Sequence, residues 1–182
     1  MTVATAGLPG IATAALVPMA TDFLTLLHRD HHDLECGLDE LLASETVEAL
    51  RGALDGVRLG LVAHAEAEDI VLYQALTRTD ASRALAALVE DAHAAHLAQE
   101  RTLSALVCTP PRTAAWFGAA RQLRDLVHDH AEQEETRLLP AIRELMPRVY
   151  DALAGEFATE RLRQLAMLQP SAPFYVPELA AS

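Results

Sequence analysis

Two segments of the chain, HAEAEDIVLYQAL at residues 64–76 and HAEQEETRLLPAI at residues 130–142, align with each other without a gap. In both segments a histidine is followed four residues later by a glutamate, as His64 and Glu68 and as His130 and Glu134. This spacing places two side chains on the same face of an α-helix, one turn apart. The repeat therefore predicts two helices that each present a histidine and a carboxylate on one face.

Helical periodicity extends outward from both segments and recurs in two more. Apolar residues at three- and four-residue spacing predict long helices over residues 22–43, 46–77, 82–107 and 113–139. Residues that cap or end helices gather at the breaks, which are Ser44-Glu45, Thr79-Asp80 and Pro110-Pro111. Because short connections between long amphipathic helices indicate antiparallel neighbours, we expect an all-α, up-down-up-down four-helix bundle. A shorter fifth helix is expected over residues 148–168.

Composition agrees with a helical domain and narrows the classes of partner. The 182 residues are 51% hydrophobic but only 4% aromatic, which favours packed helices over a β-sandwich or barrel. A net charge of -12 disfavours binding to nucleic acid or to an anionic membrane. Two cysteines make no disulfide framework, and no apolar run has the length of a membrane span, so we expect a cytoplasmic protein. The expected organisation is an N-terminal arm at 1–20, the bundle at 21–146, and a C-terminal helix with an extended tail at 147–182.

Each of the four predicted bundle helices places a histidine within its series of apolar residues. The polar residues in these inward positions are His31, His64, His96, His130, Glu68 and Glu134. The midpoints between successive histidines lie near residues 47.5, 80 and 113, close to the predicted breaks. Because residues equidistant from a turn lie at the same height in an antiparallel pair, we expect the four imidazoles in one layer. An unpaired carboxylate in a core is very costly, so this layer requires a binding partner.

The predicted layer has the donors of a metal centre with two ions. Four imidazoles and two carboxylates exceed the four ligands of a closed structural zinc site. They suit two first-row metals bridged by the carboxylates, and the mixed donors favour iron, with manganese and zinc as alternatives. Two six-coordinate ions have more positions than six side chains fill. We therefore expect an oxide or hydroxide bridge and a small ligand such as oxygen, peroxide or nitric oxide.

The order His, His-x-x-x-Glu, His, His-x-x-x-Glu resembles the bacterial hemerythrin-like, or HHE cation-binding, family. Further matches are Asp30-His31 and Glu134-Glu135, the latter followed by Leu138-Leu139-Pro140. The resemblance covers about residues 22–142 and implies a four-helix bundle with a non-heme di-iron site, with the four histidines as terminal ligands and Glu68 and Glu134 as bridges. Oxygen-carrying members have two histidines on the third helix and an aspartate five residues after the fourth-helix histidine. This chain departs from that pattern at Glu134, which argues against a dedicated oxygen carrier.

Neighbouring residues keep other assignments open. His93 is an alternative or fifth imidazole ligand beside His96, His32 is an alternative to His31, and Glu135 is an alternative bridge to Glu134. We expect His128 to be exposed because it lies off the inward face of its helix. The residues expected at the surface or just outside the ligands are His28, Asp69 and Glu135.

These features predict a non-heme di-iron protein that binds or turns over a small oxidant, namely oxygen, hydrogen peroxide or nitric oxide, with peroxide dismutation as the enzymatic version. The resemblance implies this range of ligands, because the family includes oxygen carriers, sensors and proteins that handle peroxide or nitric oxide. The alternatives are a redox or oxygen sensor and an iron store that donates iron without turnover. A protein partner bound through the segment after Pro147 and a homodimer both stay open.

Overall fold

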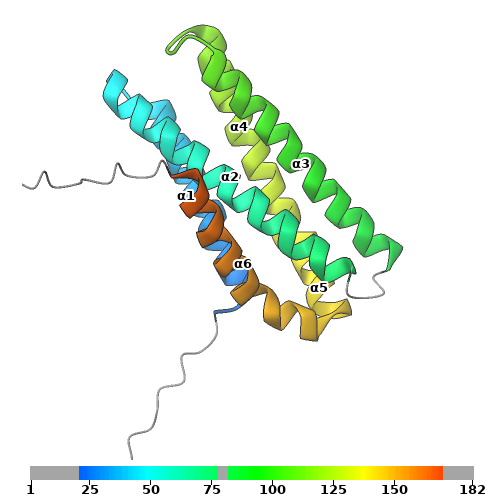
Figure 1. Ribbon diagram of the computed structural model, residues 1–182. Helices are drawn as coiled ribbons and strands as arrows, with labels where there is room; N and C mark the ends of the chain where they lie inside the picture. The colour runs from blue at the N-terminus through cyan, green and yellow to red at the C-terminus, as the bar shows by residue number, and fades with distance from the viewer. Residues whose placement is uncertain (1–20, 78–81, 170–182) are drawn as a thin grey trace, which may run out of the picture.

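The computed structural model describes residues 21–77 and 82–169, whose regular structure is entirely helical. The four long helices of the bundle are α1 (Phe23–Ala43), α2 (Val47–Thr77), α3 (Arg83–Cys108) and α4 (Ala114–Gln133). They are followed by a π-helical turn, η1 (Glu134–Leu138), and by α5 (Leu139–Leu145) and α6 (Pro147–Leu168). The predicted all-α bundle is confirmed (Figure 1). The predicted N-terminal arm, the Thr79-Asp80 break and the extended tail lie outside the described residues.

Side-chain caps explain where all four bundle helices begin. The side chain of Asp22 accepts a hydrogen bond from the backbone N–H of Thr25, and Thr46, Ser82 and Thr113 make the equivalent bonds at α2, α3 and α4. Such caps satisfy backbone N–H groups that have no partner within the helix. The predicted starts of these helices agree with the structure to within a residue.

The polar layer divides the apolar core of the bundle into two clusters. Leu34, Leu38, Leu61, Leu123 and Val127 belong to the cluster nearer the α1–α2 and α3–α4 connections. The cluster on the other side includes Phe23, Leu27, Val71, Leu138 and Phe157. Helices α1, α2 and α3 therefore contribute leucines or valines above and below their histidines, whereas α4 does so on one side of His130 and η1 on the other. This packing holds the histidines at one level, as the midpoints of the sequence predicted.

The fourth predicted helix differs from the structure near its end. The sequence pattern predicted one helix over 113–139, but α4 gives way to η1 at Glu134, and helical structure then continues in α5 to Leu145. The backbone N–H of Leu139 bonds to the carbonyl of Glu134, five residues earlier. A single π-helical turn of this kind inserts one residue into the helical register and is frequent at functional sites.

Helix α6 lies along α1 and α2, outside the four-helix bundle (Figure 1). It begins with Pro147, a residue suited to the first turn of a helix because its missing N–H has no intrahelical partner there. The ring of Phe157 contacts Phe23 of α1, with ring centroids 5.9 Å apart. The same ring lies 5.9 Å from the imidazole of His64. The predicted fifth helix thus covers one side of the polar layer.

Within the described residues, no helix combines the length and apolar character needed to cross a membrane.

Candidate metal centre

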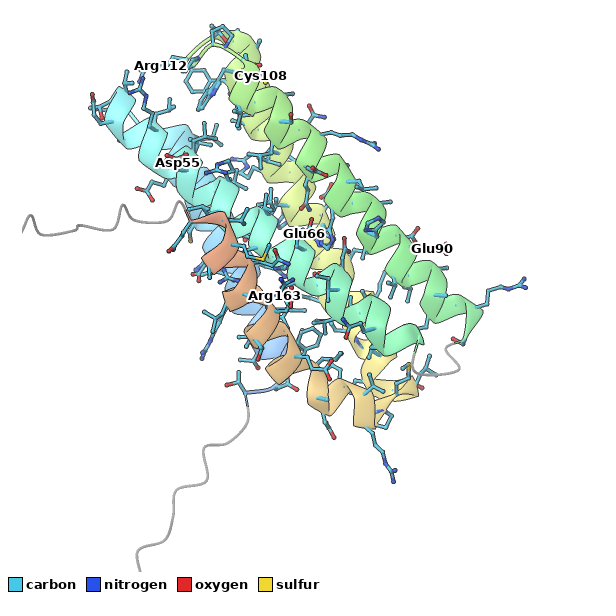
Figure 2. The ribbon with its side chains drawn as sticks, viewed as in Figure 1. Asp55, Glu66, Glu90, Cys108, Arg112 and Arg163 are labelled. Carbon is cyan, nitrogen blue, oxygen red and sulfur yellow. The ribbon has the colours of Figure 1, made fainter. Side chains whose placement is uncertain are left out.

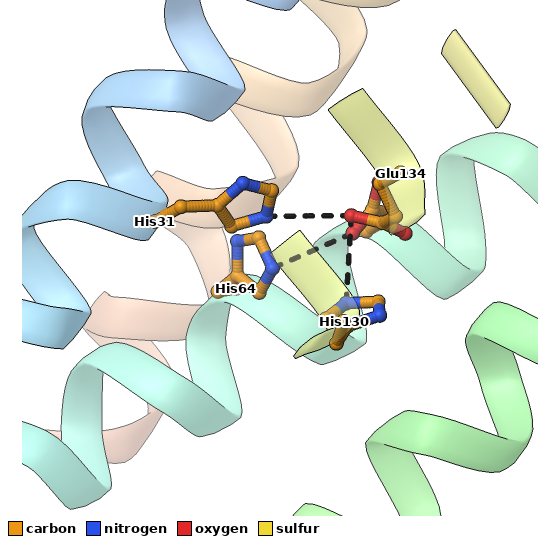
Figure 3. Close-up of side chains that lie close together, drawn as sticks. His31, His64, His130 and Glu134 are labelled. Carbon is orange, nitrogen blue, oxygen red and sulfur yellow. Dashed lines mark ion pairs between the residues drawn. The ribbon is translucent and has the colours of Figure 1, made fainter. Parts of the chain in front are cut away.

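Five side chains converge in the middle of the bundle. They are His31 of α1, His64 and Glu68 of α2, His130 of α4 and Glu134 of η1, and each contributes one potential ligand atom within 4.8 Å of all the others. Every one of them is at most 3% exposed. Figure 3 shows the imidazoles of His31, His64 and His130 directed toward the buried carboxylates, of which Glu134 is labelled. The two copies of the repeat, which are 66 residues apart, therefore meet in the structure, because His64-Glu68 and His130-Glu134 belong to the same cluster.

His96 of α3 lies at the edge of this cluster. Its Nε2 atom is 2.8 Å from Nε2 of His130 and 3.6 Å from Oε2 of Glu68. The structure thus brings all six residues expected from the sequence into one buried layer. Their assignment as ligands stays a prediction, since it concerns bonds to an ion.

The atoms that face the centre of the layer have no hydrogen-bond partners among the described residues. They are Nε2 of His31, Nε2 of His64 and both carboxylate oxygens of Glu68 and of Glu134. The nearest approaches between imidazole and carboxylate are 3.3 Å from His31 to Glu134 and 3.4 Å from His64 to Glu68. Buried carboxylates without partners are strongly unfavourable, whereas imidazole nitrogen and carboxylate oxygen are the donors that first-row metals prefer. The layer therefore fits a metal centre.

Burial controls the protonation of the layer. It lowers the pKa of His64 to about 4 and that of His130 to about 3, so both rings are neutral at pH 7. Burial, reinforced by repulsion from Glu134, raises the pKa of Glu68 well above its usual range. For Glu134 burial acts in the same direction, but attraction to His130 and His31 outweighs it and lowers the pKa to about 2. Without a metal, the pKa values of the two carboxyl groups are therefore shifted in opposite directions.

Three acidic residues surround the layer and orient its imidazoles. Carboxylates accept hydrogen bonds from Nδ1 of His64, His96 and His31 at 3.0, 2.9 and 2.9 Å, respectively, and they belong to Asp30, Asp69 and Glu135. A carboxylate on Nδ1 fixes the proton on that nitrogen and leaves the lone pair of Nε2 directed inward. For His130, by contrast, Nδ1 has no hydrogen-bond partner among the described residues.

Each of these three carboxylates has a second basic partner farther from the layer. His93 donates to Asp69 at 2.7 Å, His28 contacts Glu135 at 3.0 Å, and Arg161 of α6 donates to Asp30 at 2.7 Å. Hydrogen bonds to the buried imidazoles first, and to these outer partners second, outweigh burial, so the pKa values of all three carboxyl groups lie below their usual range. The outer carboxylates are therefore ionised at neutral pH.

The alternatives left open by the sequence now have definite positions. His93 directs Nδ1 toward Asp69 and its side chain is 54% exposed, so it lies outside the buried cluster. Glu134, and not Glu135, lies in the cluster. His32 is exposed beside Cys36, and His128 is exposed and paired with Glu35, as expected for a helix position that faces solvent.

Sequence reasoning missed the role of Arg161. Arg161 lies 131 positions from Asp30 along the chain, on a helix that the repeat does not include. No spacing within α6 distinguishes it from exposed arginines such as Arg163, which pairs with Glu160. Asp30 itself precedes His31 and could have been inferred as a partner for a histidine, but nothing in the pattern indicated which one.

Comparison with protein families agrees with this geometry. The model of the hemerythrin HHE cation binding domain matches residues 22–142, from the N-cap of α1 into α5. This chain belongs to the hemerythrin HHE cation-binding domain family. The family resemblance seen in the sequence is thereby confirmed. In a cation-binding domain, the buried His/Glu cluster suggests a metal site.

Among curated proteins, this hemerythrin-domain chain is similar to a DNA nickase from Nostoc sp.. The two are 28% identical over 118 residues, which is 65% of this chain and 32% of the nickase. The chain therefore spans about a third of the length of that relative. No solved structure matches the chain.

Proposed function

We propose that this hemerythrin-domain protein holds two iron ions in the polar layer and uses them to bind or turn over a small oxidant. The observation that carries the proposal is the set of buried imidazole and carboxylate atoms that lack hydrogen-bond partners among the described residues and face one another. Six donors are too many for a single tetrahedral ion. Iron suits their mixture of nitrogen and oxygen better than calcium or magnesium does.

The placement of the residues suggests their roles toward the two ions. Glu68 and Glu134 come from opposite halves of the repeat and face the same point, so they suit bridges. His31, His64, His96 and His130 suit terminal ligands, with an oxide or hydroxide as a further bridge. The outer carboxylates keep three imidazoles in the tautomer that a metal requires. When bound, a pair of irons supplies electrons and Lewis acidity to a small oxidant.

The protein contributes apolar walls on two sides of this chemistry. Leu27, Leu34, Leu61, Val71 and Val127 are all buried above and below the layer. The described residues add no acid or base beyond the ligands and their outer partners in this layer, so the protein's share is binding and orientation. Oxygen, hydrogen peroxide and nitric oxide all fit this description as ligands.

Iron content tests the proposal directly. The apo-protein is loaded with ferrous iron under anaerobic conditions, passed through a desalting column, and analysed for metal and protein. We expect two irons per chain and, after exposure to oxygen or peroxide, an absorption band of an oxo-bridged pair. One tightly bound iron, or a single zinc that excludes iron, would contradict a two-iron centre.

A regulatory role is the second candidate, and helix α6 favours it. Phe157 contacts the ring of His64 and Arg161 bonds to its partner Asp30, so α6 is coupled to the layer. A change at the metals would reach α6 and any protein that binds there. Reversible oxidant binding without turnover, accompanied by altered hydrogen exchange in α6, would favour the sensor. Iron release to an acceptor would favour the store.

We do not extend the nickase activity named for the Nostoc relative to this chain. The aligned part is about a third of that protein, and a net charge of -12 opposes contact with a nucleic-acid backbone. We propose a small oxidant, rather than nucleic acid or a membrane, as the partner of the site.

A further inference from the structure

A cavity of about 110 Å³ lies between α2 and α3, on the side of the polar layer where His96 is located. Its buried floor includes His96, Gln99, Leu61 and Leu103. Its outer rim includes Glu66, which Figure 2 labels on α2. The cavity thus extends from solvent to the imidazole of a predicted ligand, on a different side of the layer from Phe157.

Gln99, one of the residues that line this cavity, carries a buried polar atom without a partner. The residue is 1% exposed, and its Nε2 donates a hydrogen bond to the carbonyl of Leu126 at 3.3 Å. Its Oε1 has no hydrogen-bond partner among the described residues. A buried carbonyl oxygen without a partner costs free energy, so a ligand with a donor group would be favoured there.

The other residues that line the cavity indicate which charge a ligand can carry. Glu66, Glu100 and Asp69 line the cavity, whereas its lining contains histidine but no arginine. This negative rim disfavours anions, and the leucines of the floor disfavour a hydrated cation. A small neutral molecule matches both conditions.

We infer that this cavity is the entrance chamber of the metal centre, in which Gln99 Oε1 accepts a hydrogen bond from a small neutral molecule with an O–H or N–H group. Hydrogen peroxide has this chemistry, whereas dioxygen has no hydrogen to donate. Gln99 is therefore a specificity-determining residue that favours donors over molecules of similar size. The inference rests on the proposed function only for the destination of the ligand, since the chamber exists without a metal.

The chamber itself is tested in the full-length apo-protein with methanol, a small neutral O–H donor that oxidises no side chain. Methanol should shift the Gln99 side-chain amide resonances in a ¹⁵N–¹H NMR spectrum in a saturable manner. Ala65→Phe fills the cavity from its half-buried wall on α2 and should abolish the shift. Ala94→Phe, at an exposed position of α3 outside the lining, is the matched control and should leave it unchanged. No shift in the wild type, or an equal shift in Ala65→Phe, overturns the chamber.

Its role as an entrance is tested by stopped-flow oxidation of the iron-loaded, reduced protein. Ala65→Phe should slow oxidation by both hydrogen peroxide and dioxygen, and Ala94→Phe should slow neither. Gln99→Leu should lower the rate of oxidation by hydrogen peroxide about tenfold, which corresponds to the loss of one hydrogen bond. The rate of oxidation by dioxygen should stay within about twofold of the wild type. Equal rates in Ala65→Phe and the wild type overturn the entrance even if two irons are bound. Failure to bind two irons overturns the proposed function and leaves the methanol result standing.

Discussion

Arg161 and Asp30 are joined by a bidentate ion pair, although 131 residues separate them along the chain. The guanidinium Nε donates to Oδ2 of Asp30 at 2.7 Å, and the same oxygen accepts the Nδ1 proton of His64 at 3.0 Å. Helix α6 therefore reaches a predicted metal ligand through one intermediate side chain. Of the three outer carboxylates, Asp30 alone is held by a residue that stays charged at any physiological pH.

Arg161→Ala should weaken metal binding without removing a ligand. Asp30 loses its charged partner and holds His64 less firmly, so we expect a loss of affinity of about tenfold, the lower end of the range for losing a ligand's own hydrogen-bond partner. The measurement is competition for zinc or cobalt with a coloured chelator. Arg163→Ala, which removes an exposed arginine two residues along α6, is the control. Equal losses in both variants would mean that α6 acts by general packing rather than through Asp30.

The two glutamates should matter more for the iron pair than any single histidine does. Glu68→Ala or Glu134→Ala removes a group that suits contact with both ions, so most bound iron and any oxo-bridge absorption should be lost. His31→Ala or His96→Ala should mainly weaken one ion. Iron analysis, with circular dichroism to verify folding, compares the four variants.

His128→Ala is the control for that series, because its side chain is 65% exposed and pairs with Glu35. It should retain the iron content of the wild type. Iron loss in His128→Ala together with full retention in Glu134→Ala would show that the inward face of α4 and η1 has been misassigned.

Metal retention should depend on pH through His31 and Glu68 first. Burial would lower the pKa of His31, but Glu134 and Glu135 outweigh it and raise the pKa above 6.5. Burial also raises the pKa of Glu68. Since a metal requires both groups deprotonated, protons compete with the metal as pH falls below neutrality, and metal binding at pH 7 should release protons. His64 and His130, with pKa values of about 4 and 3, compete only in stronger acid.

Calorimetry of zinc binding in buffers with different ionisation enthalpies measures that proton release. We expect net release at pH 7 and less release at pH 8.5, where His31 is closer to deprotonated beforehand. Proton uptake at pH 7, or retention that is unchanged down to pH 4, would contradict the protonation states described above.

Glu68→Leu should stabilise the apo-protein while abolishing metal binding. The carboxylate of Glu68 is completely buried, and neither of its oxygens has a hydrogen-bond partner among the described residues. Replacing such a group with an apolar side chain of similar length should raise the free energy of unfolding by about 1–3 kcal/mol. Urea denaturation of apo-protein tests this. Leu61→Ala, in the apolar core, should instead destabilise by about 2–5 kcal/mol.

The sequence was sufficient to predict the bundle and the polar layer. Helical periodicity places His31 between Leu27 and Leu34, and the structure buries all three. The repeat related Glu68 to Glu134, and both are in the cluster. These predictions succeed because a helix of regular pitch converts spacing directly into direction.

Two features could not be predicted from spacing. The π-helical turn at Glu134–Leu138 breaks the regular pitch on which spacing arguments depend. Arg161 acts on the site through tertiary packing of α6, which no local pattern encodes. The cavity beside Gln99 likewise depends on how closely α2 and α3 approach, a property of the whole bundle.

The division of the core into two apolar clusters has a consequence for the kinetics of metal exchange. Phe23, Leu27 and Phe157 pack on one side of the layer, and Leu34, Leu38 and Leu123 pack on the other. Each cluster links several helices without help from the layer, so the helices stay aligned when the layer is empty. We therefore expect loading and release of metal to need only local opening of the bundle, and to be faster than global unfolding.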